Sequence, residues 1–174
     1  MNSVISKLAR LTALIGGVAL VALILMTSLS IVGRALARFG LGPVPGDFEI
    51  VEAGIAFCVF AFLPLAQLHG GHATVDLFTA GLPTQFNRIL LALWETLMAA
   101  IVALIAWRLF AGAENKFSNG ETSLLLQFPI WWAYAACLAP AAVAVVVALW
   151  SAYDRVRSAL TGHDSRPIAG ESLH

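Results

Sequence analysis

Four long apolar runs dominate this sequence. Residues 11–33 contain no charged side chain, and residues 48–68, 89–107 and 129–150 contain three acidic side chains between them. A helix needs about 20 mostly apolar residues to cross a membrane. Because backbone groups in lipid must form hydrogen bonds within their own segment, runs of this length predict helices and not strands. The sequence therefore predicts an all-α integral membrane protein with four transmembrane helices.

The composition of the chain points the same way. Hydrophobic residues make up 60% of the 174 residues and charged residues only 11%, whereas soluble domains carry about 25% charged residues. Ten Lys and Arg balance ten Asp and Glu, so the chain lacks the positive charge typical of nucleic-acid-binding proteins. We expect contact with membrane lipids and no nucleic-acid partner.

The connectors between the four runs are short. They cover residues 34–47, 69–88 and 108–128, and none is long enough for a second folded domain. Residues 1–160 are therefore expected to form a single four-helix membrane domain. Residues 161–174 are polar and include Gly and Pro, so we expect a disordered tail.

The basic residues predict the orientation of the chain. The first apolar run is longer than the about 7–15 residues of a signal peptide core, so we expect it to remain as the first helix. Lys and Arg favour the cytoplasmic side of a membrane. Cytoplasmic termini put Lys7, Arg10, Arg88, Arg155, Arg157 and Arg166 inside, and Arg34, Arg38, Arg108 and Lys116 outside.

An acidic cluster opens the second run and allows two interpretations. Asp47 suits a helix N-cap, and Glu49 and Glu52 follow in the first turns, where the helix dipole favours anions. Alternatively, these carboxylates pair with Arg34 or Arg38, or with charges on a partner subunit. The sequence leaves both interpretations open.

Glu95 lies about two turns into the third run, where an ionisable residue is usually paired or functional. Arg88 is seven residues earlier and can share its helix face, so a buried polar contact within the chain or with a partner is one interpretation. A shallow Glu95 that reaches the membrane surface is a second. A site for a transported ion is the third.

A histidine motif follows the second run. His69, His72 and Asp76 have the i, i+3, i+7 spacing of one helix face, which is a possible metal face. The adjacent pair Gly70 and Gly71 argues against a rigid helix there. We therefore expect no bound metal.

Aromatic residues mark the start of the fourth run. Trp131, Trp132 and Tyr134 are typical of the belt that anchors a helix at the membrane surface. This belt does not explain why the polar residues Glu121 and Ser123 lie close to so apolar a segment.

Motifs of catalysis are missing from the sequence. It has no HExxH, GxSxG or P-loop pattern, and four short helices could hardly enclose a polar solute unaided. We therefore expect no enzyme, no catalytic residue and no cofactor. The sequence favours an accessory or scaffold membrane protein.

Four features in order resemble the small permease (Q-type) subunit of tripartite ATP-independent periplasmic (TRAP) transporters. The first run ends in Val-Gly-Arg at 32–34 before a Gly/Pro loop, and acidic residues open the second run. Residues 71–76 read Gly-His-Ala-Thr-Val-Asp, similar to the family's Gly-x-His-(Ile/Val)-x-Val-Asp apart from Ala73. Residues 120–123 read Gly-Glu-Thr-Ser and residues 128–132 read Phe-Pro-Ile-Trp-Trp, similar to the family's Gly-Glu-x-Ser and Pro-x-Trp.

This resemblance implies a scaffold subunit in the bacterial inner membrane, with both termini cytoplasmic. Its partners would be a large M-type membrane subunit, which carries the substrate and sodium sites, and a P-type periplasmic binding protein that delivers an organic anion. The alternatives are a homo-oligomeric carrier that uses Glu95 for ion coupling, and a membrane enzyme that uses the histidine motif. The candidate interface or structural polar residues are Arg34, Arg38, Glu49, Glu52, His72, Asp76, Glu95, Glu121, Ser123 and Trp131.

Overall fold

The computed structural model describes residues 2–69 and 84–161, which form four long helices. Each contains a stretch long and apolar enough to cross a membrane, so the prediction of an all-α chain with four such helices is confirmed. Apart from Thr161, the expected tail lies outside the described residues. The helices are α1 (Asn2–Ala35), α2 (Asp47–Leu68), α4 (Thr84–Asn119) and α5 (Trp131–Thr161), with a 3₁₀ helix, η1 (Ala37–Phe39), after α1.

Three of the helices extend beyond the apolar runs. α4 continues to Asn119, so the first twelve residues of the expected connector 108–128 are helical. α5 continues to Thr161, and α1 begins at Asn2. Charged residues flank the runs 11–33 and 89–107, but Lys, Arg and Glu are good helix formers and do not interrupt the backbone hydrogen bonds of a helix. Which part of each helix lies in lipid stays a prediction.

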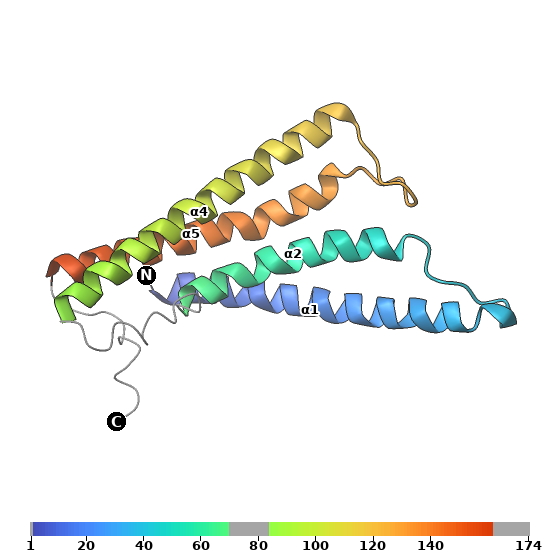
Figure 1. The fold of residues 1–174 in the computed structure, drawn as a ribbon, viewed down its shortest axis with the longest axis horizontal. Helices are drawn as coiled ribbons and strands as arrows, with labels where there is room; N and C mark the ends of the chain where they lie inside the picture. Colours follow the sequence, from blue (N-terminus) through green and yellow to red (C-terminus); the bar gives the residue numbers. More distant parts are fainter. Residues whose placement is uncertain (1, 70–83, 162–174) are drawn as a thin grey trace, which may run out of the picture.

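The helices form two hairpins that meet along α2 and α5 (Figure 1). α1 packs on α2, and α4 packs on α5. α1 begins and α5 ends at one end of the bundle, which we call the terminal end. The connections at residues 36–46 and 120–130 lie at the opposite end, the loop end, toward which the hairpins spread apart (Figure 1).

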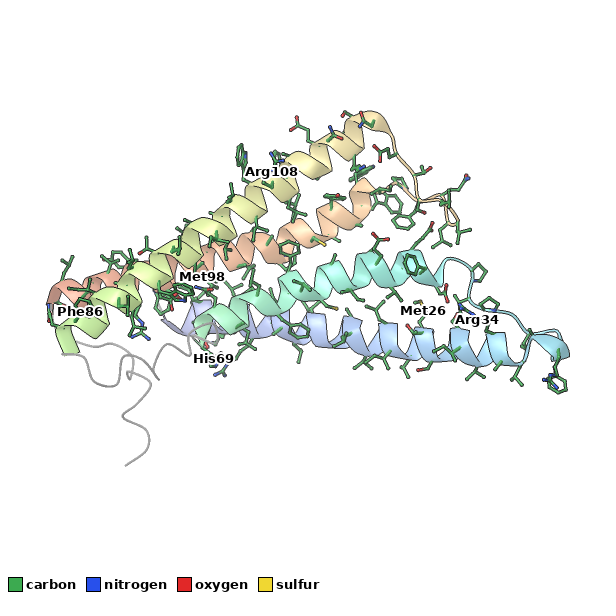
Figure 2. All side chains as sticks on the ribbon, viewed as in Figure 1. Met26, Arg34, His69, Phe86, Met98 and Arg108 are labelled. Carbon is green, nitrogen blue, oxygen red and sulfur yellow. The ribbon has the colours of Figure 1, made fainter. Side chains whose placement is uncertain are left out.

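Small side chains form the contact between α4 and α5. Ala99 and Val102 on α4 pack against Ala144, Ala148 and Ala152 on α5. Small residues allow helix backbones to approach closely in lipid. A second buried cluster joins the start of α1 to α5 at the terminal end, and many large apolar side chains of α1 and α4 point outward (Figure 2).

The α1–α2 connection depends on glycine at two positions. A Cβ atom on Gly33 would lie 2.2 Å from the carbonyl oxygen of Gly42, because the connection folds back against α1. Gly46 has a φ of 70°, and a Cβ atom there would lie 2.3 Å from Cγ of Leu126. The start of α2 therefore lies directly against the loop of the other hairpin.

Candidate functional site

Asp47 joins the two ends of the α1–α2 connection. Its Oδ2 atom accepts hydrogen bonds from Ser30 Oγ and, at 3.0 Å, from Arg34 Nη2. The buried Ser30 hydroxyl also accepts the backbone N–H of Val44 at 3.2 Å. Figure 2 shows Arg34 near the loop end of α1. These contacts hold the first helix, its connection and the second helix together.

For the acidic cluster at the start of α2, the structure decides between the two interpretations of Asp47. Gly46 is the residue that precedes α2, with no side-chain cap, so the expectation that Asp47 is the N-cap is wrong. Asp47 is instead the first helical residue, and its carboxylate turns toward α1, where it pairs with Arg34. Arg38 is exposed and has no ion pair within the described residues.

Glu49 connects α2 to the loop of the other hairpin. Its Oε1 atom accepts the backbone N–H of Leu125 at 2.7 Å. Its Oε2 atom accepts the backbone N–H of Leu126 at 3.0 Å and the hydroxyl of Ser123 at 2.9 Å. Hydrogen bonds to an ionised carboxylate are stronger than those between neutral groups. Glu49 therefore fixes the position of this loop.

Sequence reasoning missed this role of Glu49. Its partners lie 74 to 77 residues further along the chain, and no local pattern pairs positions so far apart. The one signal in the sequence is Ser123, a polar residue beside an apolar segment with no local role. Without the fold, that signal does not point to Glu49.

The loop between α4 and α5 is a narrow turn closed at its base. The backbone N–H of Ser123 donates to Phe128 O at 2.9 Å, and the N–H of Ile130 donates to Glu121 O at 3.0 Å. The Glu121 carboxylate accepts a hydrogen bond from Lys116 Nζ, which holds the pKa of Glu121 below its usual range. Glu121 therefore joins the end of α4 to the base of the loop.

The aromatic residues that open α5 face two directions. The Trp131 ring meets the Phe117 ring edge to face, with 5.3 Å between centroids. The Tyr134 ring lies against Gly112 of α4, whereas Trp132 is exposed. Trp131 and Tyr134 thus pack within the hairpin, and Trp132 points outward; the belt at the membrane surface stays a prediction.

A second polar contact lies toward the terminal end. Gln67 Nε2 donates a 2.9 Å hydrogen bond to Glu95 Oε2, and the two residues are only 2% and 8% exposed. The sequence proposes Arg88 as a possible partner of Glu95, but the Arg88 side chain lies outside the described part of the chain. The contact joins α2 to α4, which belong to different hairpins.

An open cavity of about 700 Å³ lies between the hairpins near the loop end. Its walls come from the first half of α2, the α4–α5 loop, the start of α5 and Leu109 of α4. Most of the lining is apolar. Glu52 also lines it, is exposed, and makes no hydrogen bond or ion pair with any described residue.

The predicted histidine motif falls largely outside the described residues. His72 and Asp76 are not among them, and His69 lies at the end of α2 (Figure 2), with Nδ1 2.9 Å from the backbone carbonyl of Leu65. Within residues 2–69 and 84–161, no three His, Cys, Asp or Glu side chains come together as a metal site requires.

A known family matches most of the chain. The DctQ component of the tripartite ATP-independent periplasmic transporters matches residues 23–158. The chain belongs to the DctQ family. This match confirms the resemblance seen in the sequence motifs. The matched range includes all of α2 and α4, so Glu49 and Glu95 lie in the DctQ part of the chain. Among curated proteins, no relative matches the chain.

DctQ is the small permease component of TRAP transporters. The DctQ family is a family of transporter components and not a family of enzymes. The chain is therefore a small multi-pass membrane subunit of such a transporter. In TRAP transporters, the DctQ component works together with a DctM and a DctP component.

Proposed function

We propose that this DctQ-family chain is the fixed scaffold of a sodium-coupled importer of an organic anion. It lies in the bacterial inner membrane with both termini in the cytoplasm. The large M-type subunit carries the substrate and sodium sites, and the P-type binding protein delivers the solute. This chain holds the large subunit in place and does not bind the solute itself.

The observation that carries this proposal is that hydrogen bonds join the two hairpins near both ends of their contact. Near the loop end, Glu49 binds the loop of the α4–α5 hairpin. Near the terminal end, Gln67 binds Glu95. A scaffold must keep its shape while another domain moves past it, and joints at both ends oppose the hinge or sliding motions of moving domains.

The environment of Glu95 favours the scaffold over the carrier alternative. A carboxylate that couples ion movement faces a water-filled cavity or an ion pathway. Glu95 is buried and hydrogen-bonded to Gln67 within the same chain, and it does not line the cavity between the hairpins. This environment supports a structural role for the residue.

The outer face of α1 supports a large membrane partner. Apolar side chains are exposed along most of its length, among them Leu14, Val18, Val21, Leu25 and Leu29. Only 11% of the most apolar stretch of α1 is buried inside the chain. Such a face needs lipid or another membrane protein around it, and a second subunit of the transporter satisfies this need.

The positions of the basic residues support the orientation. Lys7, Arg10, Arg155 and Arg157 belong to the terminal end of α1 and α5, whereas Arg34 and Lys116 at the loop end are each paired with a carboxylate. With the terminal end in the cytoplasm, the loop end faces the periplasm. The exposed Arg38 then lies on the surface nearest the binding protein.

Reconstitution tests the proposal. The chain, a large M-type permease and a P-type protein would be purified and combined in liposomes, with a solute found by screening organic acids for stabilisation of the P-type protein. We expect uptake only when all three components and an inward sodium gradient are present. Uptake by this chain alone would contradict the scaffold role, and uptake that ignores the sodium gradient would contradict the coupling.

A further inference from the structure

The cavity between the hairpins has a shape and a polarity that suit one particular ligand. Along α2 its wall runs from Phe48 to Phe60, twelve residues apart, which is about 18 Å at about 1.5 Å per residue. The hydrocarbon of one membrane leaflet is about 15 Å thick, half of the about 30 Å core. The cavity is therefore about as deep as one lipid chain is long.

Polar groups gather at one end of this cavity. On α2, Glu49 and Glu52 lie near the helix start, and only apolar residues, Ala53, Ala56 and Phe60, follow them along the wall. An amphiphile has this same order, with a polar head at the membrane surface and an apolar tail below it. The α2 side of the lining therefore matches a lipid whose head group lies toward the loop end.

The Glu52 carboxylate, near the loop end of the cavity, favours one kind of head group. The Glu49 carboxylate is already bound to three donors of the loop, whereas Glu52 makes no hydrogen bond or ion pair within the described part of the chain. A carboxylate beside apolar lining favours a cation and repels an anion. An ammonium group is therefore the complementary partner for Glu52.

The rim of the cavity is itself suited to lipid. Leu124 and Leu125, at the tip of the α4–α5 loop, line the cavity and are 88% and 67% exposed. Glu49 holds the backbone of Leu125 in place. Exposed leucines on a fixed loop are costly in water and favourable among acyl chains.

From this depth, polarity and charge, we propose that the cavity binds one phosphatidylethanolamine molecule. One acyl chain lies between α2 and α5, and the ammonium group donates hydrogen bonds to the Glu52 carboxylate.

Native mass spectrometry of the purified full chain, alone and with its large subunit, tests this proposal. After delipidation, the protein is placed in nanodiscs that hold equal amounts of phosphatidylethanolamine and phosphatidylglycerol with the same acyl chains. We expect one retained lipid per chain and about a threefold to tenfold preference for phosphatidylethanolamine, the effect of one partly exposed ion pair.

Two variants and one matched control sharpen the test. Glu52→Gln should retain a lipid but lose the head-group preference, and Ala56→Trp should lose the lipid because the indole fills the cavity. Glu114→Gln, which removes an exposed carboxylate of α4 that does not line the cavity, should behave like the unmodified chain. If Ala56→Trp fails to fold, Glu52→Gln still decides the matter.

Three outcomes would overturn the proposal. One is an unmodified chain that retains no lipid. Another is an equal head-group preference in the unmodified chain and in Glu52→Gln. The third is loss of the lipid whenever the large subunit is bound, which would assign the cavity to a protein partner instead.

Discussion

Gln67 Nε2 lies 2.9 Å from Glu95 Oε2, so α2 and α4 share a buried hydrogen bond although α4 packs mainly against α5. This contact joins the two hairpins through α2 and α4, whose backbones make few close contacts with each other. If either side chain is removed, the other is left buried without its partner. In general this costs about 1–3 kcal/mol, although in membranes such bonds average only about 0.6 kcal/mol.

The first prediction concerns this contact. Glu95→Ala should lower the unfolding temperature of the purified protein and the yield of its complex, because it leaves the Gln67 amide unpaired. Glu95→Gln should stay close to the unmodified protein, since its side-chain oxygen can still accept the hydrogen bond. Size-exclusion profiles after heating measure both variants. Normal assembly of Glu95→Gln with loss of sodium-dependent uptake would favour the carrier interpretation instead.

The second prediction concerns the loop held by Glu49. In Glu49→Ala, the backbone N–H groups of Leu125 and Leu126 lose their acceptor, so their hydrogen exchange should become faster by about tenfold. Peptide-level exchange measured by mass spectrometry reports this directly. Glu114→Ala, an exposed acidic position on α4, is the control. Equal protection of the loop in both variants would show that Glu49 does not hold it.

The third prediction tests the close approach at Gly46. Gly46→Ala adds a Cβ atom where Leu126 already lies and forces a residue with a side chain to a φ of 70°, so it should destabilise the protein by more than about 1 kcal/mol. The double variant Gly46→Ala, Leu126→Ala removes the clash but not the backbone strain. Gly46→Ala should therefore cost less stability in the Leu126→Ala background than in the unmodified protein, but the cost should not fall to zero. A cost of zero in that background would mean that the backbone strain has no energetic effect.

The fourth prediction concerns pH. Because Lys116 lowers the pKa of Glu121 in the folded protein, the contact stabilises the fold above the unfolded-state pKa of about 4.3, and this stabilisation is lost as the pH falls through the lower folded-state value. The unfolding temperature of the unmodified protein should exceed that of Glu121→Gln at neutral pH. The gap should close on acidification. A gap that widens in acid would reverse the sign and contradict the assigned contact.

The fifth prediction concerns orientation. A single cysteine at position 118, near the end of α4, should react with an impermeant maleimide in intact cells, and a single cysteine at position 172 should react only after the cells are opened. Both are placed in a background without Cys58 and Cys137, which are buried. The opposite labelling pattern would invert the topology and move the loop end to the cytoplasm.

The existence of the four helices can be predicted from the sequence, but the positions of their ends cannot. The four helices follow from apolar runs because backbone groups in lipid leave few other structures possible. The helix ends do not follow, since α4 passes Arg108, Glu114 and Lys116 and ends at Asn119. Charge marks where a helix leaves lipid, whereas its end depends on the turn that comes next.

Local hydropathy and the order of short motifs are enough to establish the membrane-spanning class of this protein, its four helices and its membership of the DctQ family. The partners of the polar residues follow only from the packed fold. Asp47 forms an ion pair with Arg34, Glu49 accepts hydrogen bonds from a loop more than 70 residues away, and Glu95 accepts a hydrogen bond from Gln67. Pairs this distant in sequence meet only after helix packing sets their positions, and no periodicity within a segment contains that information.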